Sequence, residues 1–266
     1  MILNYFLKKI SYFLPLDFFI WMAPKNIMLY GHIICDSQTH HLKKLYNYPN
    51  FNDLNEIMYS FERFGFKKVS LKDFQFLENY KKIHLSLDDG FKQIFSDFER
   101  YKNLGFPFSI HIISEAVLNS DFKIISKLSN QYIQDKDLFL SVEDIHFLKE
   151  NKIEIGFHTN NHDYLGDVIL IDEKFKSNVF PNKEISPLLT KPLIFSYPYR
   201  SPINVDEIND YLFKNGYSII LGTSSSNKSS KSYYNRFSID YLTRDFFSLK
   251  HLIKHQILMH KIKNIL

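Results

Sequence analysis

The feature that most constrains the fold of this chain is an apolar run that ends in two adjacent carboxylates and a glycine, the sequence LSLDDG at residues 85–90. Residues 82–87 are β-prone, and an amphipathic stretch begins at Phe91. This pattern predicts a buried strand, a tight turn and then a helix. Asp88 and Asp89 repel each other, so the pair persists most easily when a cation lies against at least one of them. The alternative is a helix N-cap, in which an aspartate accepts backbone N–H bonds.

The composition favours one large domain with a well-filled core. A chain of 266 residues that is 45% hydrophobic and 17% aromatic is too apolar to be disordered. The net charge of +4 comes from scattered lysines, which suits an anionic or membrane-adjacent partner but does not argue for nucleic acid. Cys35 is the only cysteine, so no internal disulfide can form, and the redox compartment is left open.

The first 24 residues form an apolar stretch that is interrupted by Lys8, Lys9, Pro15 and Asp17. No uncharged run approaches the ~20 residues of a spanning helix, and the order of a signal peptide is absent. We therefore divide the chain into an amphipathic extension, residues 1–25, and a main domain, residues 26–266. The extension either packs on the domain or lies at a membrane interface. We expect a cytoplasmic protein, with peripheral membrane contact through residues 1–24 left open.

Strands and helices are expected to alternate along most of the chain, which is typical of a parallel α/β architecture. Predicted strands cover residues 26–35, 66–70, 82–87, 108–114, 152–157, 191–197, 217–221 and 236–241. Predicted helices cover residues 51–64, 70–80, 91–104, 141–150, 172–186, 205–215 and 246–265. Polar residues gather where several of these strands end, and a parallel barrel places its functional site on that face.

Two histidines four positions apart follow the strand at residues 152–157. A helical turn or a wide loop would bring His158 and His162 to one cation. With Asp89 they make two imidazoles and one carboxylate, the three-ligand pattern of a catalytic zinc or similar divalent ion with one open position. The H-x-x-x-H spacing alone is common, and the alternative is that both histidines are cap or surface residues.

Other histidines lack an acidic partner at a strand end. His251 and His255 have the same spacing as His158 and His162, and His40 lies next to His41. We interpret these four histidines as surface residues.

Three segments occur in a characteristic order: LSLDDG, then GFHTNNH, then FSYPYR. Together they resemble the motifs of the polysaccharide deacetylase family, the NodB-homology carbohydrate esterases. The resemblance extends over roughly residues 26–250, and the joint pattern is specific although each motif alone is not. It implies an α/β fold, a deformed (β/α)7 barrel of the NodB-homology type, which agrees with the alternation of strands and helices.

The resemblance also implies a site and a reaction. Asp89, His158 and His162 would bind one divalent metal ion, zinc or alternatively cobalt, nickel or manganese. Asp88 would be the general base that takes a proton from the attacking water. The backbone N–H of Tyr199 would stabilise the oxyanion. The implied function is metal-dependent removal of an N-acetyl group from an amino sugar of a cell-envelope glycan or its precursor, so the expected partner is an N-acetylated carbohydrate.

Two positions depart from the family pattern. Ser196 stands where many relatives carry an arginine that orients the base, and Arg236, on a later predicted strand, could replace that arginine. The alternative for Arg236 is a surface salt bridge. Arg200 stands where a glycine is usual, so the backbone there is strained or the guanidinium faces an anionic group of the substrate.

Protonation of the leaving amine requires an acid, for which there are two candidates. His260 matches the family's late motif in its letters but lies far beyond Arg236. His32 lies on the first predicted strand, where a permuted branch of the family carries its histidine, and we expect His32 to be the acid; the alternative is a buried core histidine. Two other functions stay open: a non-catalytic glycan-binding protein on the same fold, and a hydrolase of a non-sugar C–N bond.

Overall fold

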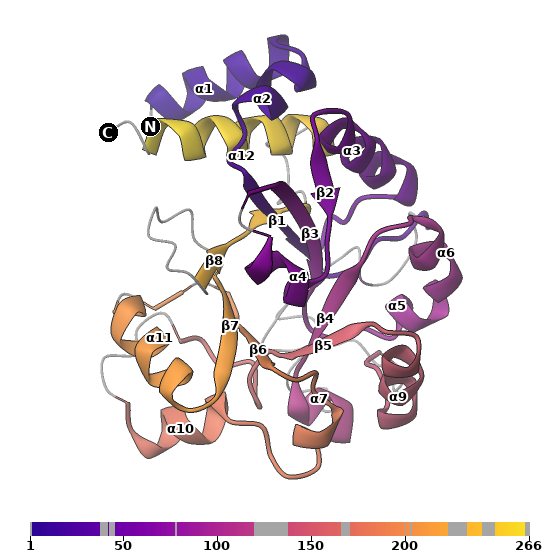
Figure 1. The fold of residues 1–266 in the computed structure, drawn as a ribbon, viewed down its shortest axis with the longest axis vertical. Helices are drawn as coiled ribbons and strands as arrows, with labels where there is room; N and C mark the ends of the chain where they lie inside the picture. The colour runs from indigo at the N-terminus through magenta and orange to yellow at the C-terminus, as the bar shows by residue number, and fades with distance from the viewer. Residues whose placement is uncertain are drawn as a thin grey trace.

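The computed structural model describes residues 2–37, 42, 46–77, 79–119, 138–165, 171–199, 201–202, 204–222, 233–240 and 248–263. Its centre is a parallel sheet that curls into a nearly closed barrel with helices around it (Figure 1). The predicted α/β barrel is therefore confirmed. The strands are β1 (Asn26–Gly31), β2 (Phe66–Lys68), β3 (Lys81–Leu87), β4 (Phe108–Ile112), β5 (Glu154–Phe157), β6 (Leu193–Ser196), β7 (Tyr217–Gly222), β8 (Tyr233–Asn235) and β9 (Phe237–Ser238).

The two ends of the sheet meet in one short segment of the chain. The strand order is β8-β7-β6-β5-β4-β3-β1-β9, and β2 pairs with β3 beside this path. In sequence, β8 and β9 are separated only by Arg236. Because β8 pairs with β7 and β9 pairs with β1, this interrupted strand joins both edges of the sheet. Counted as one strand, β8 and β9 reduce the eight strands of the path to the seven that were expected.

The helices surround the barrel (Figure 1), and local sequence explains where several of them begin. Ser141 and Asp144 form the capping box that the sequence predicts. Asn50 caps α3, its side chain accepting from the backbone N–H of Asp53, and the helix expected over residues 91–104 is two short helices. The helices are α1 (Ile2–Phe13), α2 (Leu16–Met22), α3 (Phe51–Arg63), α4 (Leu71–Phe76), α5 (Gln93–Ser96), α6 (Phe98–Asn103), α7 (Ser114–Asn119), α9 (Val142–Glu150), α10 (Glu173–Val179), α11 (Val205–Lys214) and α12 (Leu249–Lys263).

The N-terminal helices α1 and α2 pack against the C-terminal helix α12 at one end of the molecule, the top in Figure 1. This packing covers His251 and His255, which are only 6% and 8% exposed, so the prediction that they are surface residues is wrong. His251 Nε2 lies 3.1 Å from the carbonyl oxygen of Lys8. His40 and His41 lie outside the described residues. No helix in the described part of the chain is long and apolar enough to cross a membrane.

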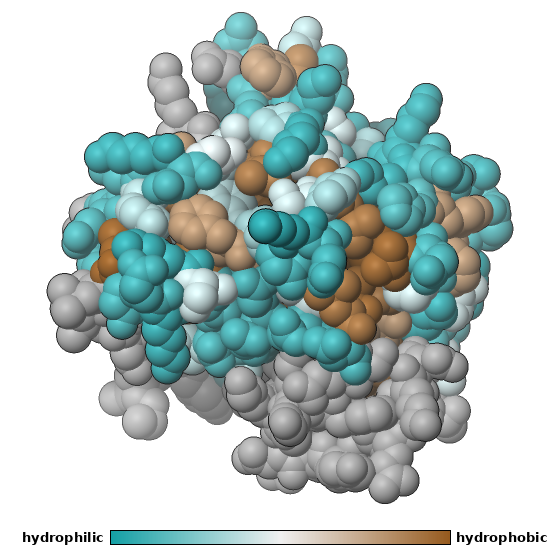
Figure 2. Space-filling view, turned by 90° about the horizontal axis from the view of Figure 1, so that it is seen from below, coloured by the Kyte–Doolittle hydropathy of each residue, from teal (hydrophilic) through white to brown (hydrophobic). Residues whose placement is uncertain are grey.

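Among the described residues, the face of the molecule opposite these helices is mostly hydrophilic, with one contiguous hydrophobic patch and smaller hydrophobic areas between polar side chains (Figure 2). The apolar side chains lie mainly inside, where one large cluster joins the strands to the helices that cover them. The barrel interior nevertheless contains buried polar side chains, among them Ser86, Ser109 and His111. They lead to the carboxyl ends of the strands, where the polar residues of the sequence motifs gather.

Candidate active site

The two adjacent carboxylates lie at the carboxyl end of β3. The backbone N–H of Asp88 donates to the carbonyl oxygen of Gly31 at 2.8 Å, which continues the pairing of β1 with β3 by one residue. The chain then turns, because Asp89 and Gly90 have φ values of 70° and 72°. A side chain at Gly90 would lie 3.1 Å from Ile112 Cγ2 and would also require this left-handed backbone, so glycine is needed at the turn. Both aspartates are buried.

Asp88 is held by the guanidinium of Arg236. Arg236 Nη1 donates to Asp88 Oδ1 at 2.7 Å and Nη2 donates to Asp88 Oδ2 at 2.8 Å, a bidentate pair in which both residues are buried. Arg236 also donates to Ser86 Oγ and to the carbonyl oxygen of Gly222. Burial opposes ionisation of Asp88, but the charge and the hydrogen bonds of Arg236 outweigh it and hold the pKa of Asp88 well below its usual range. The alternative of a surface salt bridge for Arg236 is therefore wrong.

Asp89 faces two imidazoles. Its Oδ1 lies 3.4 Å from His158 Nε2 and 3.2 Å from His162 Nε2. The ligand atoms of these three buried residues all lie within 4.8 Å of one another. The structure thus brings together the three residues that the sequence analysis selected as metal ligands, from β3 and from the segment that follows β5.

The segment that carries the two histidines is a loop, not a helical turn. Thr159 and His162 have positive φ values of 73° and 53°. The loop is closed by a hydrogen bond of 2.9 Å from the backbone N–H of His162 to Thr159 Oγ1. Of the two ways in which the sequence could bring His158 and His162 together, the structure has the loop.

Ser196 determines which nitrogen of His158 faces Asp89. His158 Nδ1 lies 3.0 Å from the carbonyl oxygen of Ser196 and 2.6 Å from its Oγ. A carbonyl oxygen accepts only, so Nδ1 carries the proton and Nε2 presents its lone pair toward Asp89. Burial lowers the pKa of His158 to about 4, so the ring is neutral at physiological pH. A neutral imidazole held in this tautomer is the form that binds a metal.

The chemistry of this site fits a divalent cation. Asp89 Oδ1 is buried and has no hydrogen-bond partner in the described structure, although it lies between two imidazole nitrogens. Burial opposes ionisation of Asp89, but His162 and His32 outweigh it and hold its pKa well below the usual range. One carboxylate and two imidazoles match the ligands of catalytic zinc sites and of related divalent ions.

His32 lies on the other side of Asp89, directly after β1. Its Nε2 is 3.7 Å from Asp89 Oδ2, and its Nδ1 donates to Asp240 Oδ2 at 2.5 Å. Burial opposes a charge on His32, but Asp240 and Asp89 outweigh it and raise its pKa to about 9. The ring of Tyr46 stacks on His32 with centroids 3.6 Å apart, and the Tyr46 hydroxyl donates to Asp89 Oδ2 at 2.7 Å. His260, in contrast, lies on α12 and packs against Phe237.

Known proteins resemble the chain in structure rather than in sequence. No family model and no curated protein sequence matches it. A deacetylase of Streptococcus pyogenes, solved with acetate, has a TM-score of 0.63 at 15% identity, covering 88% of this chain and 99% of that one. A de-N-acetylase of Aggregatibacter actinomycetemcomitans has a TM-score of 0.60 at 19% identity, covering 85% and 99%. A polysaccharide deacetylase of Bacillus cereus has a TM-score of 0.59 at 15% identity, covering 87% and 68%. The chain has the fold of the polysaccharide deacetylases.

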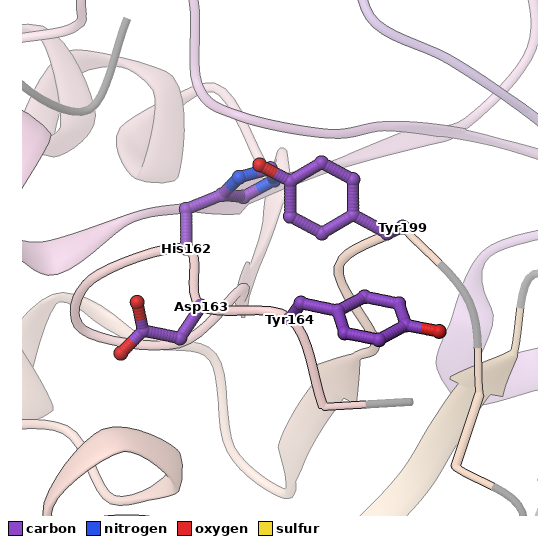
Figure 3. A pocket seen from close by; sticks show the side chains of 4 residues that line it. All are labelled: His162, Asp163, Tyr164 and Tyr199. Carbon is purple, nitrogen blue, oxygen red and sulfur yellow. The ribbon is translucent and has the colours of Figure 1, made fainter. Parts of the chain in front are cut away.

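The family resemblance inferred from the three motifs is thus confirmed at the level of the polysaccharide deacetylase fold. The third motif, FSYPYR, lies at the end of β6 and beside the histidine loop. The rings of Tyr199 and His162 have centroids 4.6 Å apart, and Figure 3 shows these side chains together with Tyr164 and Asp163. These four residues line a cleft of about 370 Å³. Arg200, where strain or an anionic contact was expected, lies outside the described residues.

Backbone strain is concentrated at this site. Among the described residues, five that are not glycine have a positive φ, and four of them are Asp89, Thr159, His162 and Tyr199. Such conformations cost energy and persist where the surrounding structure holds them, most often at functional sites. In this polysaccharide deacetylase fold, the strain falls on the three motifs that first indicated the site.

Three residues at the site were not found in the sequence: Asp240 and His111, which are buried, and Tyr46, which is partly buried. Asp240 and Tyr46 contact His32 and Asp89, as described above. His111 is on β4, inside the barrel. Its Nε2 lies 3.0 Å from Ser109 Oγ, and its Nδ1 has no hydrogen-bond partner in the described structure. Asp240 is a carboxylate near the end of the strand predicted over residues 236–241, and this position is the one signal that could have indicated it. Tyr46 lies in a stretch without periodicity, and His111 is one of two polar residues, with Ser109, in a short strand that reads as buried, so neither carries such a signal.

Proposed function

We propose that the protein is a metal-dependent hydrolase that removes an N-acetyl group from an amino sugar of a cell-envelope glycan or its precursor. The observation that carries the proposal is the buried cluster of Asp89, His158 and His162, whose donor atoms lie within 4.8 Å of one another at the carboxyl ends of the barrel strands. The polysaccharide deacetylase fold supports the reaction class. The open cleft beside His162 supports a glycan chain rather than a fully enclosed small molecule.

In this proposal, Asp89, His158 and His162 hold the metal ion. When bound, a divalent ion supplies Lewis acidity, which polarises the amide carbonyl and makes a water molecule more acidic. Zinc agrees best with the ligand set, and cobalt, nickel or manganese are the alternatives.

Asp88 is the proposed general base. Arg236 binds both of its oxygens and keeps it ionised, so Asp88 is unprotonated at neutral pH and available to take a proton. The same pairing fixes the direction of the carboxylate, since each oxygen accepts one guanidinium N–H and keeps a lone pair for the attacking water. Asp88 Oδ2 lies 4.0 Å from His158 Nε2, so the base stands next to the proposed ligands.

His32 is the proposed general acid. It lies on the side of Asp89 opposite His158, and Asp240 accepts from its Nδ1, so Nε2 is the atom directed toward the site. The two carboxylates beside it favour the protonated ring, which is the form that can deliver a proton to the departing sugar nitrogen. The backbone N–H of Tyr199 is the proposed oxyanion donor, at a strained position beside His162.

The test is release of acetate from N-acetylglucosamine oligomers by the purified protein, measured with its metal, after treatment with a chelator, and after divalent ions are added back. We expect acetate release that is lost with the chelator and restored by the metal. Equal acetate release with and without metal would contradict the proposed metal dependence.

The same assay separates the alternatives. Bound metal with no acetate from any acetylated glycan would favour a glycan-binding protein on this fold. Hydrolysis of non-sugar amides in a substrate panel, without hydrolysis of acetylated sugars, would favour the other amide hydrolase. Ser196, one motive for the binding alternative, contacts His158, so its presence is compatible with a working metal site.

A further inference from the structure

The junction of α1 and α2 exposes an unusual number of large hydrophobic side chains. We call residues 12–21 the N-terminal elbow. Eleven large hydrophobic residues are exposed in the described part of the chain, and five belong to the elbow: Tyr12, Phe13, Leu14, Phe18 and Trp21. Phe13 is 78% exposed and Trp21 is 68% exposed. Single exposed hydrophobic residues are ordinary, but a concentration within ten residues indicates a binding surface.

The elbow is held firmly, so its exposed side chains are not the result of a loose end. The buried ammonium of Lys254 donates to the carbonyl oxygens of Tyr12 and Leu14 at 3.2 and 2.9 Å, at the end of α1. On α2, Phe19 and Ile20 are completely buried, whereas Phe18 and Trp21 lie three residues apart on the outward face. One face of α2 is therefore buried in the core, and the opposite face, which carries Phe18 and Trp21, is exposed.

The surroundings of the elbow are basic. Lys9 on α1 and Lys25 after α2 are exposed, and Lys254 of α12 contacts the elbow itself. The acidic residues Glu56 and Glu62 of the neighbouring α3 pair with Lys250 and Lys68. Neither α1 nor α12 contains an acidic residue. The one acidic residue of α2 is Asp17, which pairs with Arg63 at 2.6 Å. The charge next to the exposed aromatic side chains is thus positive.

We propose that the N-terminal elbow docks the protein onto an anionic lipid surface. Tryptophan and phenylalanine side chains enter the headgroup region, while neighbouring lysines are attracted to anionic headgroups. A second copy of this chain is a poorer occupant, because two identical basic faces would repel each other. This proposal is independent of the deacetylase proposal, since it involves none of the site residues.

The position of the elbow is compatible with a working site on the docked protein. Residues 23–25 join α2 to the amino end of β1, whereas Asp88, His158 and the other site residues follow the carboxyl ends of their strands. β1 has six residues, a length of roughly 20 Å at the rise of a β-strand. Docking through the elbow therefore engages the end of β1 that is farther from the site.

Trp21 allows a direct test, because it is the only tryptophan in the chain. The full chain is mixed with vesicles of phosphatidylcholine alone or with phosphatidylglycerol added, and tryptophan emission and co-flotation are measured. We expect a blue shift of the emission and co-flotation with the anionic vesicles. The double substitution Phe13→Ser and Phe18→Ser should weaken vesicle binding at least tenfold, and Lys9→Glu with Lys25→Glu should weaken it by about fivefold per lysine.

The matched control is the double substitution Phe76→Ser and Tyr80→Ser, which removes exposed aromatic side chains far from the elbow in sequence. It should bind vesicles like the parent protein, and thermal melts would show that each variant is folded. Unchanged Trp21 emission with anionic vesicles, or equal loss of binding in the control, would overturn the proposal. So would a stable dimer that the Phe13→Ser and Phe18→Ser substitutions convert to a monomer.

Discussion

Two pairs of histidines in this chain have the same spacing and lie in entirely different surroundings. His158 and His162 follow β5, and both direct Nε2 toward the buried carboxylate of Asp89. His251 and His255 lie within α12, where they are buried under α1, and they belong to no cluster that could hold a metal in the described part of the chain. Both pairs are buried, so burial does not distinguish them.

The difference lies in backbone position and in the third partner. The first pair stands at the carboxyl end of a barrel strand, in a loop with two left-handed residues, and Ser196 fixes the tautomer of His158. The second pair stands in a regular helix, where His251 Nε2 lies 3.1 Å from the carbonyl oxygen of Lys8 and the His251 ring packs edge-on against Tyr12. Spacing therefore indicates a metal site only when a carboxylate reaches the same point.

Substitution of one histidine from each pair should give the largest contrast. His158→Ala or Asp89→Ala should abolish metal retention, because each removes one of three proposed ligands, and should abolish acetate release with it. His251→Ala should retain metal and activity. The measurement is metal content after dialysis, together with kcat/KM for an N-acetylglucosamine oligomer. Loss of metal from His251→Ala alone would reverse the assignment of the two pairs.

Asp88→Asn should separate metal binding from turnover at the site formed by Asp89, His158 and His162. The amide cannot accept the proton of the attacking water, so turnover should fall by roughly 10²–10⁴ while metal retention stays at the parent level. The control is Glu56→Gln, which changes a carboxylate that pairs with Lys250 on α12 and should leave turnover unchanged. Parental turnover of acetylated sugar by Asp88→Asn would show that the base is assigned wrongly.

Ser196→Ala should have an intermediate effect. It removes the Oγ that lies 2.6 Å from His158 Nδ1 but keeps the backbone carbonyl, so the tautomer is held less firmly. We expect the metal affinity to fall by about tenfold and by no more than about a hundredfold. A competition titration with a chelator measures it. An affinity within twofold of the parent value would mean that the carbonyl alone orients the ring.

The smallest expected effect concerns stability at the second pair. Burial, together with the charges of Lys8 and His251, lowers the pKa of His255 to about 4. The unfolded chain takes up the proton near pH 6.5, so His255 destabilises the protein progressively as the pH falls from about 6.5 to about 4. In the His255→Leu variant, the free energy of unfolding should therefore fall by about 2 kcal/mol less over this pH range. Denaturant unfolding at several pH values measures the difference, and parallel curves for both proteins would argue against a buried neutral histidine.

Much of the fold and the centre of the site could be predicted from the sequence, because both depend on local patterns. The run into Asp88 and Asp89 and the run into His158 each mark a strand end, and parallel strands bring their ends to one face. Arg236 could be named as a partner for Asp88 only because the family resemblance implies an arginine that orients the base. The burial of the α12 histidines could not be predicted. It depends on the packing of α1 on α12, which is a contact between the two ends of the chain.

The residues around His32 show a second limit. Asp240 is 208 positions from His32 in sequence, and it follows β9, a strand of only two residues, so the sequence did not indicate that the two side chains pair. Tyr46 reaches Asp89 from a segment without regular structure, where no periodicity indicates which side chains point inward. Such partners depend on the path of loops in three dimensions, which one sequence does not specify.

The most direct test of the central claim is a crystal structure of the protein grown with zinc or cobalt. Our account predicts one ion bound by Asp89 Oδ1, His158 Nε2 and His162 Nε2, at about 2.0–2.2 Å from each atom. An ion bound instead by His251 and His255, or no ion between Asp89 and the two imidazoles at saturating metal, would contradict it.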